Sequence, residues 1–494
     1  MSALKKGILS SVILVGESLL NKLVGLVSTL ILARVLLPED FGIVAVGTLF
    51  IGFFEVISSI GASQYLLREK KITDQDVNTA FSINFLLRTI LTLIVVGLSF
   101  VINGVFEDDR IQGVVLGLAI IFLSESFQNP GIIYLKRNQE YAKIVKVTLS
   151  GKVLAVISAV SIALLYQSYW ALVIGHAINR LSMLVGYYLI YPYLPKFELV
   201  KAKKQWMFSI WMLPQSILGF FRTQLDTFLT ATYFGQAQLG SYHTMKYIAF
   251  IPTSHLMIPL TQPLLVELRK ASSNVKEFSK IFNASFILAL IVAAPLSFFV
   301  LVFHELTTQV LLGENWLEFS ELMGVFCVLV TTTVLSLQCS KTLIVFDKPN
   351  HLLIYEVVSF VVIYTILIFS GFDNIIEFAK IRIWLEVLTI FMLLVYVSLR
   401  YTSIIHFGKL ISAMFAIGFC AWCSVAVVDF FGVANYTSNA FINLCLSSLS
   451  VSILYGLQLV LGYLLVFKSY EECFYLKSLF NRAIQPISNR LFKA

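Results

Sequence analysis

Ionisable side chains lie inside the apolar stretches of this 494-residue chain, where burying a charge is energetically unfavourable. An ionised group at the centre of a bilayer costs about 2.5–3.5 kcal/mol, so it normally faces protein or water. The first eight apolar stretches hold six basic and four acidic side chains: Lys22, Arg88, Lys152, Arg180, Arg222 and Lys246, with Glu17, Glu55, Glu125 and Asp226. This surplus of cations predicts a hydrated, positively charged chamber that suits an anionic group, particularly phosphate.

Depth in the apolar stretches selects the candidate binding residues from this set. The predicted anion-binding cations are Lys22, Arg88, Arg180, Arg222 and Lys246. Three acids are candidates for coupling to Na⁺ or H⁺, and they are Glu17, Glu55 and Asp226. No other cofactor and no metal are expected.

A second interpretation is that the same charges neutralise one another in buried pairs that fix helix packing. Arg222 and Asp226 are one helical turn apart, as are Arg382 and Glu386, a spacing that allows pairing along one face. The other acids would need partners from neighbouring helices, with Lys22, Arg88 and Lys152 as the candidates for Glu17, Glu55 and Glu125. Both interpretations stay open at this point.

The elements that position these groups are membrane-spanning helices. Hydrophobic residues make up 58% of the chain, charged residues only 13%, and the mean hydropathy is +0.86, which excludes an ordinary soluble protein. A span needs about 20 apolar residues. Fourteen segments qualify: 8–35, 42–66, 79–103, 112–133, 144–166, 169–191, 205–234, 240–266, 279–303, 316–346, 351–370, 376–399, 409–430 and 441–467. Segments 316–346 and 376–399 carry the most polar residues, and without them the count is twelve.

Basic residues fall mostly into alternate gaps between these segments, which predicts the orientation of the chain. Positively charged loops stay on the cytoplasmic side. Clusters such as 68–71, 136–146 and 196–204 are therefore expected in the cytosol, together with both termini. The charged and aromatic tail 468–494 is predicted to be an amphipathic helix on the inner headgroups.

An internal repeat appears when the chain is shifted by 198 residues. Residues 32–42 then lie over 230–240, and 64–69 over 262–267. Both matched helix pairs begin on the same side of the membrane, so the repeat is parallel and its axis lies along the membrane normal. We expect an all-α membrane protein with two six-helix lobes, 1–195 and 196–402, followed by two further helices in 403–467.

Several function classes lack support in the sequence. There is no Walker A loop, no His-Glu-x-x-His motif and no long outer loop that could hold a catalytic domain, so an enzyme is not expected. The net charge of +8 is spread over short turns, which accounts for topology and contact with the lipid bilayer rather than for a nucleic-acid partner.

Three segments carry a resemblance to a known family: KKGILSS at 5–11, LARVLLPEDFG at 32–42 and GASQYLLR at 61–68. They resemble the Wzx-type polysaccharide flippases of the multidrug/oligosaccharidyl-lipid/polysaccharide exporter superfamily. The resemblance implies a bacterial inner-membrane protein that moves undecaprenyl-diphosphate-linked oligosaccharide repeat units to the periplasmic leaflet by alternating access, for O-antigen, capsule or exopolysaccharide. It also implies that the protein acts together with a polysaccharide polymerase and a chain-length regulator.

The resemblance extends to site residues. Related lipid II flippases line a central cavity with basic residues from helices one, two and eight. By position, Lys22 in helix one and Lys246 in helix eight are similar to these basic residues, whereas helix two has Glu55 where a basic residue is expected. The alternatives are a cation-coupled multidrug exporter of the same superfamily, a membrane polymerase or ligase of lipid-linked sugars, and a scaffold that transports nothing.

Overall fold

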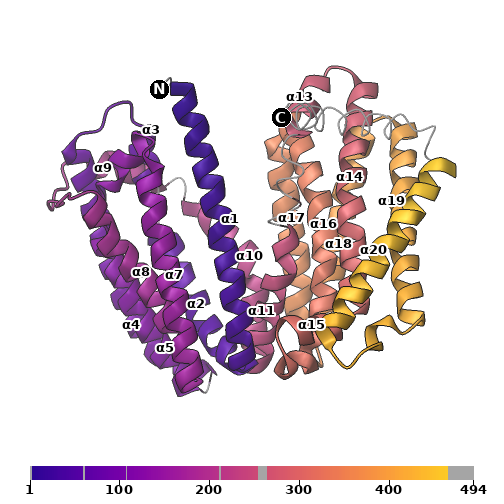
Figure 1. Cartoon of the computed structure of the whole chain (residues 1–494). Coiled ribbons are helices and arrows are strands. Elements are labelled where there is room, and N and C mark those ends of the chain that lie inside the picture. Colours follow the sequence, from indigo (N-terminus) through magenta and orange to yellow (C-terminus); the bar gives the residue numbers. More distant parts are fainter. Residues whose placement is uncertain are drawn as a thin grey trace, which may run out of the picture. The chain divides into compact units, whose positions relative to one another are not determined.

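The computed structural model describes residues 3–58, 62–106, 108–210, 213–253, 257 and 264–465, which form helices and turns without a strand. The chain divides into two compact units, Met1–His243 (unit 1) and Thr244–Ala494 (unit 2). Figure 1 shows the helical ribbons of both. The predicted all-α membrane class is confirmed. The tail 468–494 lies outside the described residues, and the division into lobes at 195 and 402 stays a prediction.

Unit 1 is built from long helices with short helices at their ends. Its elements are α1 Ala3–Val35, α2 Pro38–Ser58, α3 Ala62–Arg68, α4 Asp74–Phe106, α5 Asp109–Ser124, η1 Glu125–Phe127, α6 Ile132–Arg137, α7 Tyr141–Tyr166, α8 Trp170–Ile190, α9 Ala202–Ile210, α10 Leu213–Tyr233 and the start of α11 Gln236–Pro252. Helix α7 packs against α1 and α8, while α5 packs against α2, α4 and α8. Helix α5 is thus central to this unit.

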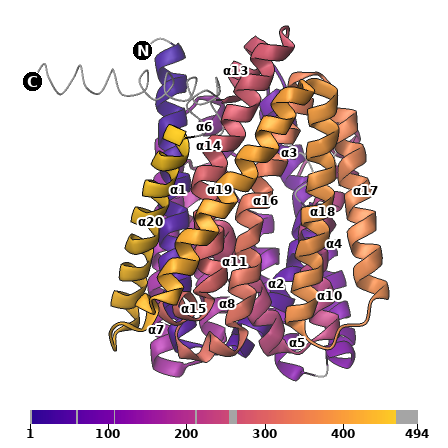
Figure 2. The same cartoon turned by 90° about the vertical axis from the view of Figure 1, so that its right-hand side faces the viewer.

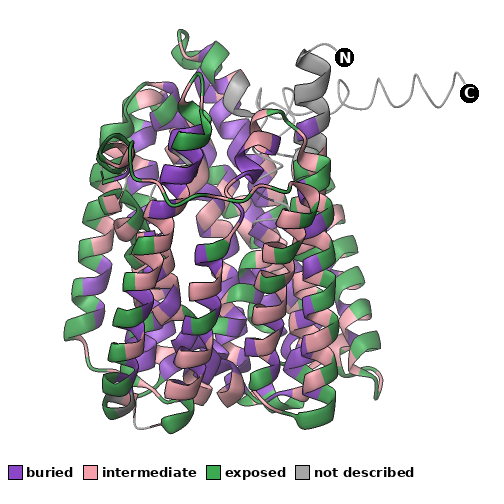
Figure 3. Ribbon diagram, turned by 90° about the vertical axis from the view of Figure 1, so that its left-hand side faces the viewer, coloured by how far each residue is buried: buried purple, intermediate pink, exposed green. Residues whose placement is uncertain are grey.

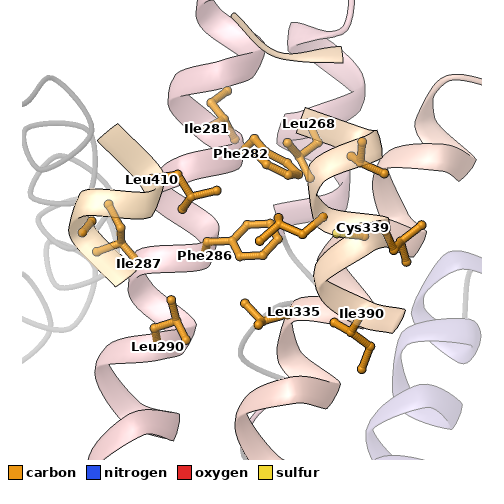
Figure 4. Packing of buried hydrophobic residues seen from close by; sticks show 14 of the residues in the cluster. Leu268, Ile281, Phe282, Phe286, Ile287, Leu290, Leu335, Cys339, Ile390 and Leu410 are labelled. Atoms are coloured by element: carbon orange, nitrogen blue, oxygen red, sulfur yellow. The ribbon is translucent and has the colours of Figure 1, made fainter. Parts of the chain in front are cut away.

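Unit 2 contains the remaining helices, α13 Leu264–Ala271, α14 Val275–Val302, α15 His304–Leu311, η3 Glu314–Phe319, α16 Ser320–Val345, α17 Pro349–Phe369, α18 Ile375–Tyr401, α19 Ile404–Phe430, η4 Val433–Asn435 and α20 Ala440–Leu465. Figure 2 faces this unit, in which α14 packs against α16 and α19. Its core includes Phe282 and Phe286, whose ring centroids are 4.7 Å apart, and Cys339. Figure 4 shows these side chains interleaved between the helices, without an ionisable carboxylate or ammonium among the labelled residues.

Twelve of the described helical segments are long and apolar enough to span a membrane. Both segments predicted as the most polar are among them, as Glu314–Val345 and Ile375–Tyr401. The predicted segments 205–234 and 240–266 are not among them. Helix α10 carries Arg222 and Asp226, and α11 has only 17 residues, short of the roughly 20 that a span needs.

Large apolar residues are exposed on these helices. Figure 3 colours many helical positions of unit 1 as exposed. Leu93, Leu165 and Leu189 are 68%, 75% and 78% exposed. Apolar surface on this scale would be unfavourable in water, whereas the hydrocarbon core of a bilayer is its natural solvent.

The motif at 32–42 has a physical explanation at the start of α2. Pro38 occupies the first helical turn, where its missing N–H is not needed, and the Asp40 carboxylate accepts from the Leu37 N–H at 2.9 Å. A Cβ on Gly42 would lie 1.8 Å from the Gln236 carbonyl oxygen, and one on Gly240 would lie 1.8 Å from that of Pro38. Only glycine therefore permits α2 and α11 to cross here.

This crossing is reciprocal in the numbering of the predicted repeat. Pro38 and Gln236 are 198 residues apart (236 − 38), and so are Gly42 and Gly240 (240 − 42). Each glycine contacts the carbonyl at the first position of the other helix. The contact supports the internal repeat, because equivalent positions of the two copies make equivalent contacts.

Candidate functional site

The segment predicted as one helix over 112–133 is broken in the structure. Helix α5 ends at Ser124, η1 covers Glu125–Phe127, and α6 begins only at Ile132. Asn129, Pro130 and Gly131 form the break, and such a triplet is a strong turn signal. The prediction of a continuous helix was wrong because apolar residues on both sides masked that signal.

Asn129 fixes the break to the end of α8. Its Oδ1 accepts from the Gly131 N–H at 2.8 Å, and its Nδ2 donates to the carbonyls of Tyr187 at 3.1 Å and Tyr191 at 2.6 Å. The last carbonyls of a helix lack partners within the helix, and a buried amide can satisfy them. A discontinuous helix of this kind places backbone polar groups beside a cavity, as in many transporters.

Glu125, at the first position of η1, joins two arginines from neighbouring helices. Its Oε2 forms a short ion pair with Nη1 of Arg88 on α4, and its Oε1 lies 2.6 Å from Nη1 of Arg180 on α8. The second contact is an ion pair, and Oε1 of Glu125 has no hydrogen-bond partner within the described residues. Arg180 also contacts Glu55 of α2, with 3.1 Å between Nη2 and Oε1.

Burial differs along this network, which consists of Arg88, Glu125, Arg180 and Glu55. Glu125 and Arg88 are 7% and 12% exposed, whereas Arg180 and Glu55 are 28% and 33% exposed. Arg88 is further held by Asn84, whose Oδ1 accepts from Nε at 3.1 Å, and by the ring of Phe122, whose centroid is 4.9 Å from the guanidinium.

Two guanidinium groups and two carboxylates make the network formally neutral. The interpretation as buried pairs therefore holds for Glu125, for which Arg88 was a predicted partner, and for Glu55, whose partner Arg180 was not predicted. The anion-binding roles of Arg88 and Arg180 stay predictions.

A cavity of about 520 Å³ adjoins this network inside unit 1. Its walls come from α4, the break after α5, α6, α8 and α9, and include Arg88, Glu125, Lys136, Arg180, Gln205 and Trp206. Lys136 is half-buried at this wall, and the loss of hydration lowers the pKa of its ammonium group. The cavity combines charged, amide and aromatic groups within a size typical of ligand sites.

Short helices close one end of unit 1, where Figure 1 shows α3 and α9. The Arg137 guanidinium donates to the carbonyls of Leu66 at 2.6 Å and Glu69 at 2.7 Å, at the end of α3. Lys204 of α9 contacts the Glu69 carboxylate at 3.0 Å, and Lys201 contacts Asp76 at 2.8 Å. The predicted cytosolic clusters 68–71, 136–146 and 196–204 thus meet at the same end of the unit.

The segment that leads into α9 is tied to the start of α4. The Tyr193 hydroxyl donates to Asn78 Oδ1 at 2.8 Å, and burial raises the pKa of Tyr193 to about 12. Tyr193 therefore stays protonated, and can donate, at every physiological pH.

The other predicted site residues are carried by α1, α10 and α11. On α1, Glu17 accepts from the Thr148 hydroxyl of α7, and Lys22 is exposed. On α10, Asp226 is buried and accepts from the Thr227 N–H at 2.8 Å and the Tyr242 hydroxyl at 3.0 Å. Arg222 is exposed on α10. Lys246 is half-buried on the part of α11 that belongs to unit 2.

Most residues of the cavity wall were not predicted as site residues, among them Lys136, Gln205 and Trp206. Lys136 was predicted only as one of the cytosolic charges that set the orientation of the chain. The Asn129–Gly131 turn was the signal that could have placed it beside a cavity. Among the residues that the structure describes, no cluster of histidine, cysteine or acidic side chains could hold a metal ion.

Residues 31–321 match the protein family described as polysaccharide biosynthesis protein. Among curated proteins, the chain is similar to the lipopolysaccharide biosynthesis protein WzxC of Escherichia coli (strain K12), with 21% identity over 66% of this chain and 66% of that protein. It is also similar to the succinoglycan biosynthesis transport protein ExoT of Rhizobium meliloti (strain 1021), with 24% identity over 61% of this chain and 62% of the relative. The alignments thus span slightly less than two thirds of these relatives.

Among solved structures, the fold is similar to that of lipid II flippase MurJ in an inward closed conformation. The TM-score is 0.72 at 13% sequence identity, and the alignment covers 92% of this chain and 99% of the other. At this identity the likeness concerns the fold alone.

Proposed function

The chain belongs to the polysaccharide biosynthesis protein family, and from this premise we propose that it is a lipid-linked oligosaccharide flippase. In this proposal it moves undecaprenyl-diphosphate-linked repeat units from the cytosolic to the periplasmic leaflet of a bacterial inner membrane, for O-antigen, capsule or exopolysaccharide. The observation that carries the proposal is the family match over residues 31–321 in a chain with twelve candidate spans within its described residues.

Two further observations support it. The named relatives include a lipopolysaccharide biosynthesis protein and a succinoglycan biosynthesis transport protein, and the fold is similar to that of a lipid II flippase. A transporter also explains the cations at membrane depth, since moving a diphosphate headgroup through a bilayer requires compensating charge.

The proposed transport is alternating access, with both termini in the cytosol. The diphosphate would bind to a subset of the predicted cations Lys22, Arg88, Arg180, Arg222 and Lys246. Exposed Lys22 can approach a phosphate directly, whereas Arg88 and Arg180 must first exchange a carboxylate for a phosphate oxygen. Coupling to Na⁺ or H⁺ through Glu17, Glu55 or Asp226, and cooperation with a polymerase and a chain-length regulator, are part of the same proposal.

A reconstituted system tests the function directly. The purified protein is placed in proteoliposomes with a fluorescent undecaprenyl-diphosphate oligosaccharide, and its movement between leaflets is followed by loss of protection from an impermeant quencher. We expect protein-dependent flipping, with Lys22→Ala, Arg222→Ala and Lys246→Ala each reducing it at least tenfold, on the order of one charge-assisted contact. Lys143→Gln, at a 56% exposed lysine in the first turn of α7 that pairs with Glu140, is the matched control.

The result decides between the function and its alternatives. Export of a cationic dye without movement of the lipid-linked sugar would contradict the proposal and favour a multidrug exporter. Polymerised or transferred sugar products in the same liposomes would favour a membrane enzyme. Full flipping by all three cation variants would retain the function and remove the assigned diphosphate site.

A further inference from the structure

The cavity in unit 1 has more binding groups than its internal contacts use. Gln205 is only 1% exposed, and its Nε2 donates to the Asp76 carbonyl at 2.8 Å. This bond orients the amide, and its Oε1 has no hydrogen-bond partner within the described residues. A buried acceptor without a donor is unfavourable, so a donor from a ligand or from water is expected at this atom.

Lys136 is the second unused group. It lines the same cavity, and among the described residues no carboxylate contacts its ammonium. The nearby carboxylates of Glu125 and Glu55 are already held by Arg88 and Arg180. Because those four charges sum to zero, Lys136 gives the cavity and its adjoining network together one excess positive charge.

The rest of the wall offers the groups that recognise a sugar ring. Trp206 also lines the cavity, and an indole ring can pack against C–H groups. Asn84 and Gln128 add amides, and the Oδ1 of Asn84 is occupied by Arg88, which leaves its NH₂ group as a donor. Donors, a buried acceptor, an aromatic ring and a single excess cation together fit a polyhydroxylated ligand with one negative charge.

We propose that this cavity binds an acidic sugar, with the sugar carboxylate on the Lys136 ammonium and a hydroxyl donating to Gln205 Oε1. The inference rests on the proposed function, since it assigns a uronic-acid unit to the oligosaccharide that the protein moves. Lys136, Gln205 and Trp206 belong to the end of unit 1 where the basic turns meet, which is the predicted cytosolic end where such a lipid-linked sugar is collected.

Free sugars probe the cavity without the lipid. Full-length protein in lipid nanodiscs is titrated with glucuronate, glucose, acetate and inorganic phosphate, and binding is followed by saturation-transfer NMR. We expect glucuronate to bind about tenfold or more tightly than glucose or acetate, because only glucuronate uses both the charge and the hydroxyl contacts. Tighter binding of phosphate than of glucuronate, or no measurable binding of glucuronate, overturns the proposal.

Variants locate the binding. Lys136→Gln should weaken glucuronate about tenfold or more and leave glucose unchanged, whereas Lys136→Arg should retain most of the affinity. Gln205→Leu should weaken both sugars, and Lys143→Gln should weaken neither. Each variant is first shown to keep the thermal stability of the parent. Glucuronate binding that survives both Lys136→Gln and Gln205→Leu overturns the site.

Failure of this inference is separable from failure of the proposed function. Flipping of a lipid-linked sugar by a protein that does not bind glucuronate leaves the flippase and removes the acidic-sugar cavity. Glucuronate binding without any flipping leaves the cavity and removes the flippase.

Discussion

Substitution of Glu125 by glutamine is the sharpest test of the ion network in unit 1. The carboxylate is 7% exposed, and its two oxygens separately contact Arg88 and Arg180. Breaking a buried ion pair by removing one partner costs about 3–5 kcal/mol, because the remaining charge is uncompensated. Arg180 keeps Glu55, so the loss falls mainly on Arg88, and we expect about 3 kcal/mol.

The matched control is Glu55→Gln. Glu55 has one ion-pair contact, and its side chain is 33% exposed, so water compensates much of the loss. The expected cost is at most about 1 kcal/mol. Both variants retain the size and shape of the side chain and differ from the parent only in charge and hydrogen bonding.

Unfolding of the purified protein measures both effects. For a unit of this size, a loss of about 3 kcal/mol corresponds to a drop in midpoint temperature of roughly 6–12 °C. Removing both partners should be less harmful, so the double variant with Arg88→Gln is expected to recover part of the loss. Equal destabilisation by Glu125→Gln and Glu55→Gln, or strictly additive effects of Glu125→Gln and Arg88→Gln, would refute the assigned network.

Three other perturbations follow from the same contacts. Gly42→Ala places a methyl group on the Gln236 carbonyl and should destabilise by about 1–3 kcal/mol in the same unfolding assay, whereas Gly97→Ala, with nothing within 4 Å, should be neutral or stabilising. The Arg110 guanidinium lowers the pKa of the Asp108 carboxyl group below its usual 3.8, so this ion pair stabilises the folded protein above that pH. Its contribution, under about 1 kcal/mol, should disappear on acidification and in Asp108→Asn. Outward movement of a headgroup with two negative charges should accelerate under an inside-negative diffusion potential, because the driving force for two charges is roughly 5 kcal/mol per 100 mV. An unchanged rate in the liposome assay would contradict net movement of charge.

Most of the fold could be predicted from apolar segment length and loop charge, because a bilayer imposes both requirements on every span. The exceptions have specific causes. Helix α10 contains the charged residues Arg222 and Asp226, which make it less apolar than a typical span. Its position in the fold therefore depends on packing that a hydropathy scale does not measure. The break at Asn129–Gly131 lies within an otherwise apolar run, and the predicted helix over 112–133 missed its turn residues, which are the only signal of the break in the sequence.

The candidate site could be predicted only in part, because depth in the membrane identifies charged residues but not their rotation about each helix. Arg88 and Glu125 come from segments 37 residues apart in the chain, and their meeting depends on how α4 and η1 pack. Gln205 and Trp206 precede α10 on the short helix α9, whose contacts with α3 and α4 no periodicity reveals.

The neutral network changes how the predicted surplus of cationic side chains in unit 1 is interpreted. Arg88 is fixed by Glu125, Asn84 and the Phe122 ring, so a phosphate must displace a carboxylate that is already desolvated and aligned. That exchange gains less than binding to a cation with no such partner. Lys22 is exposed on α1, and no carboxylate contact of Lys136 is found within the described residues. Attraction for the anionic groups of the proposed substrate in unit 1 should therefore depend more on these two lysines, Lys22 for the diphosphate and Lys136 for a sugar carboxylate, than on Arg88 and Arg180, which pair with Glu125 at the broken helix.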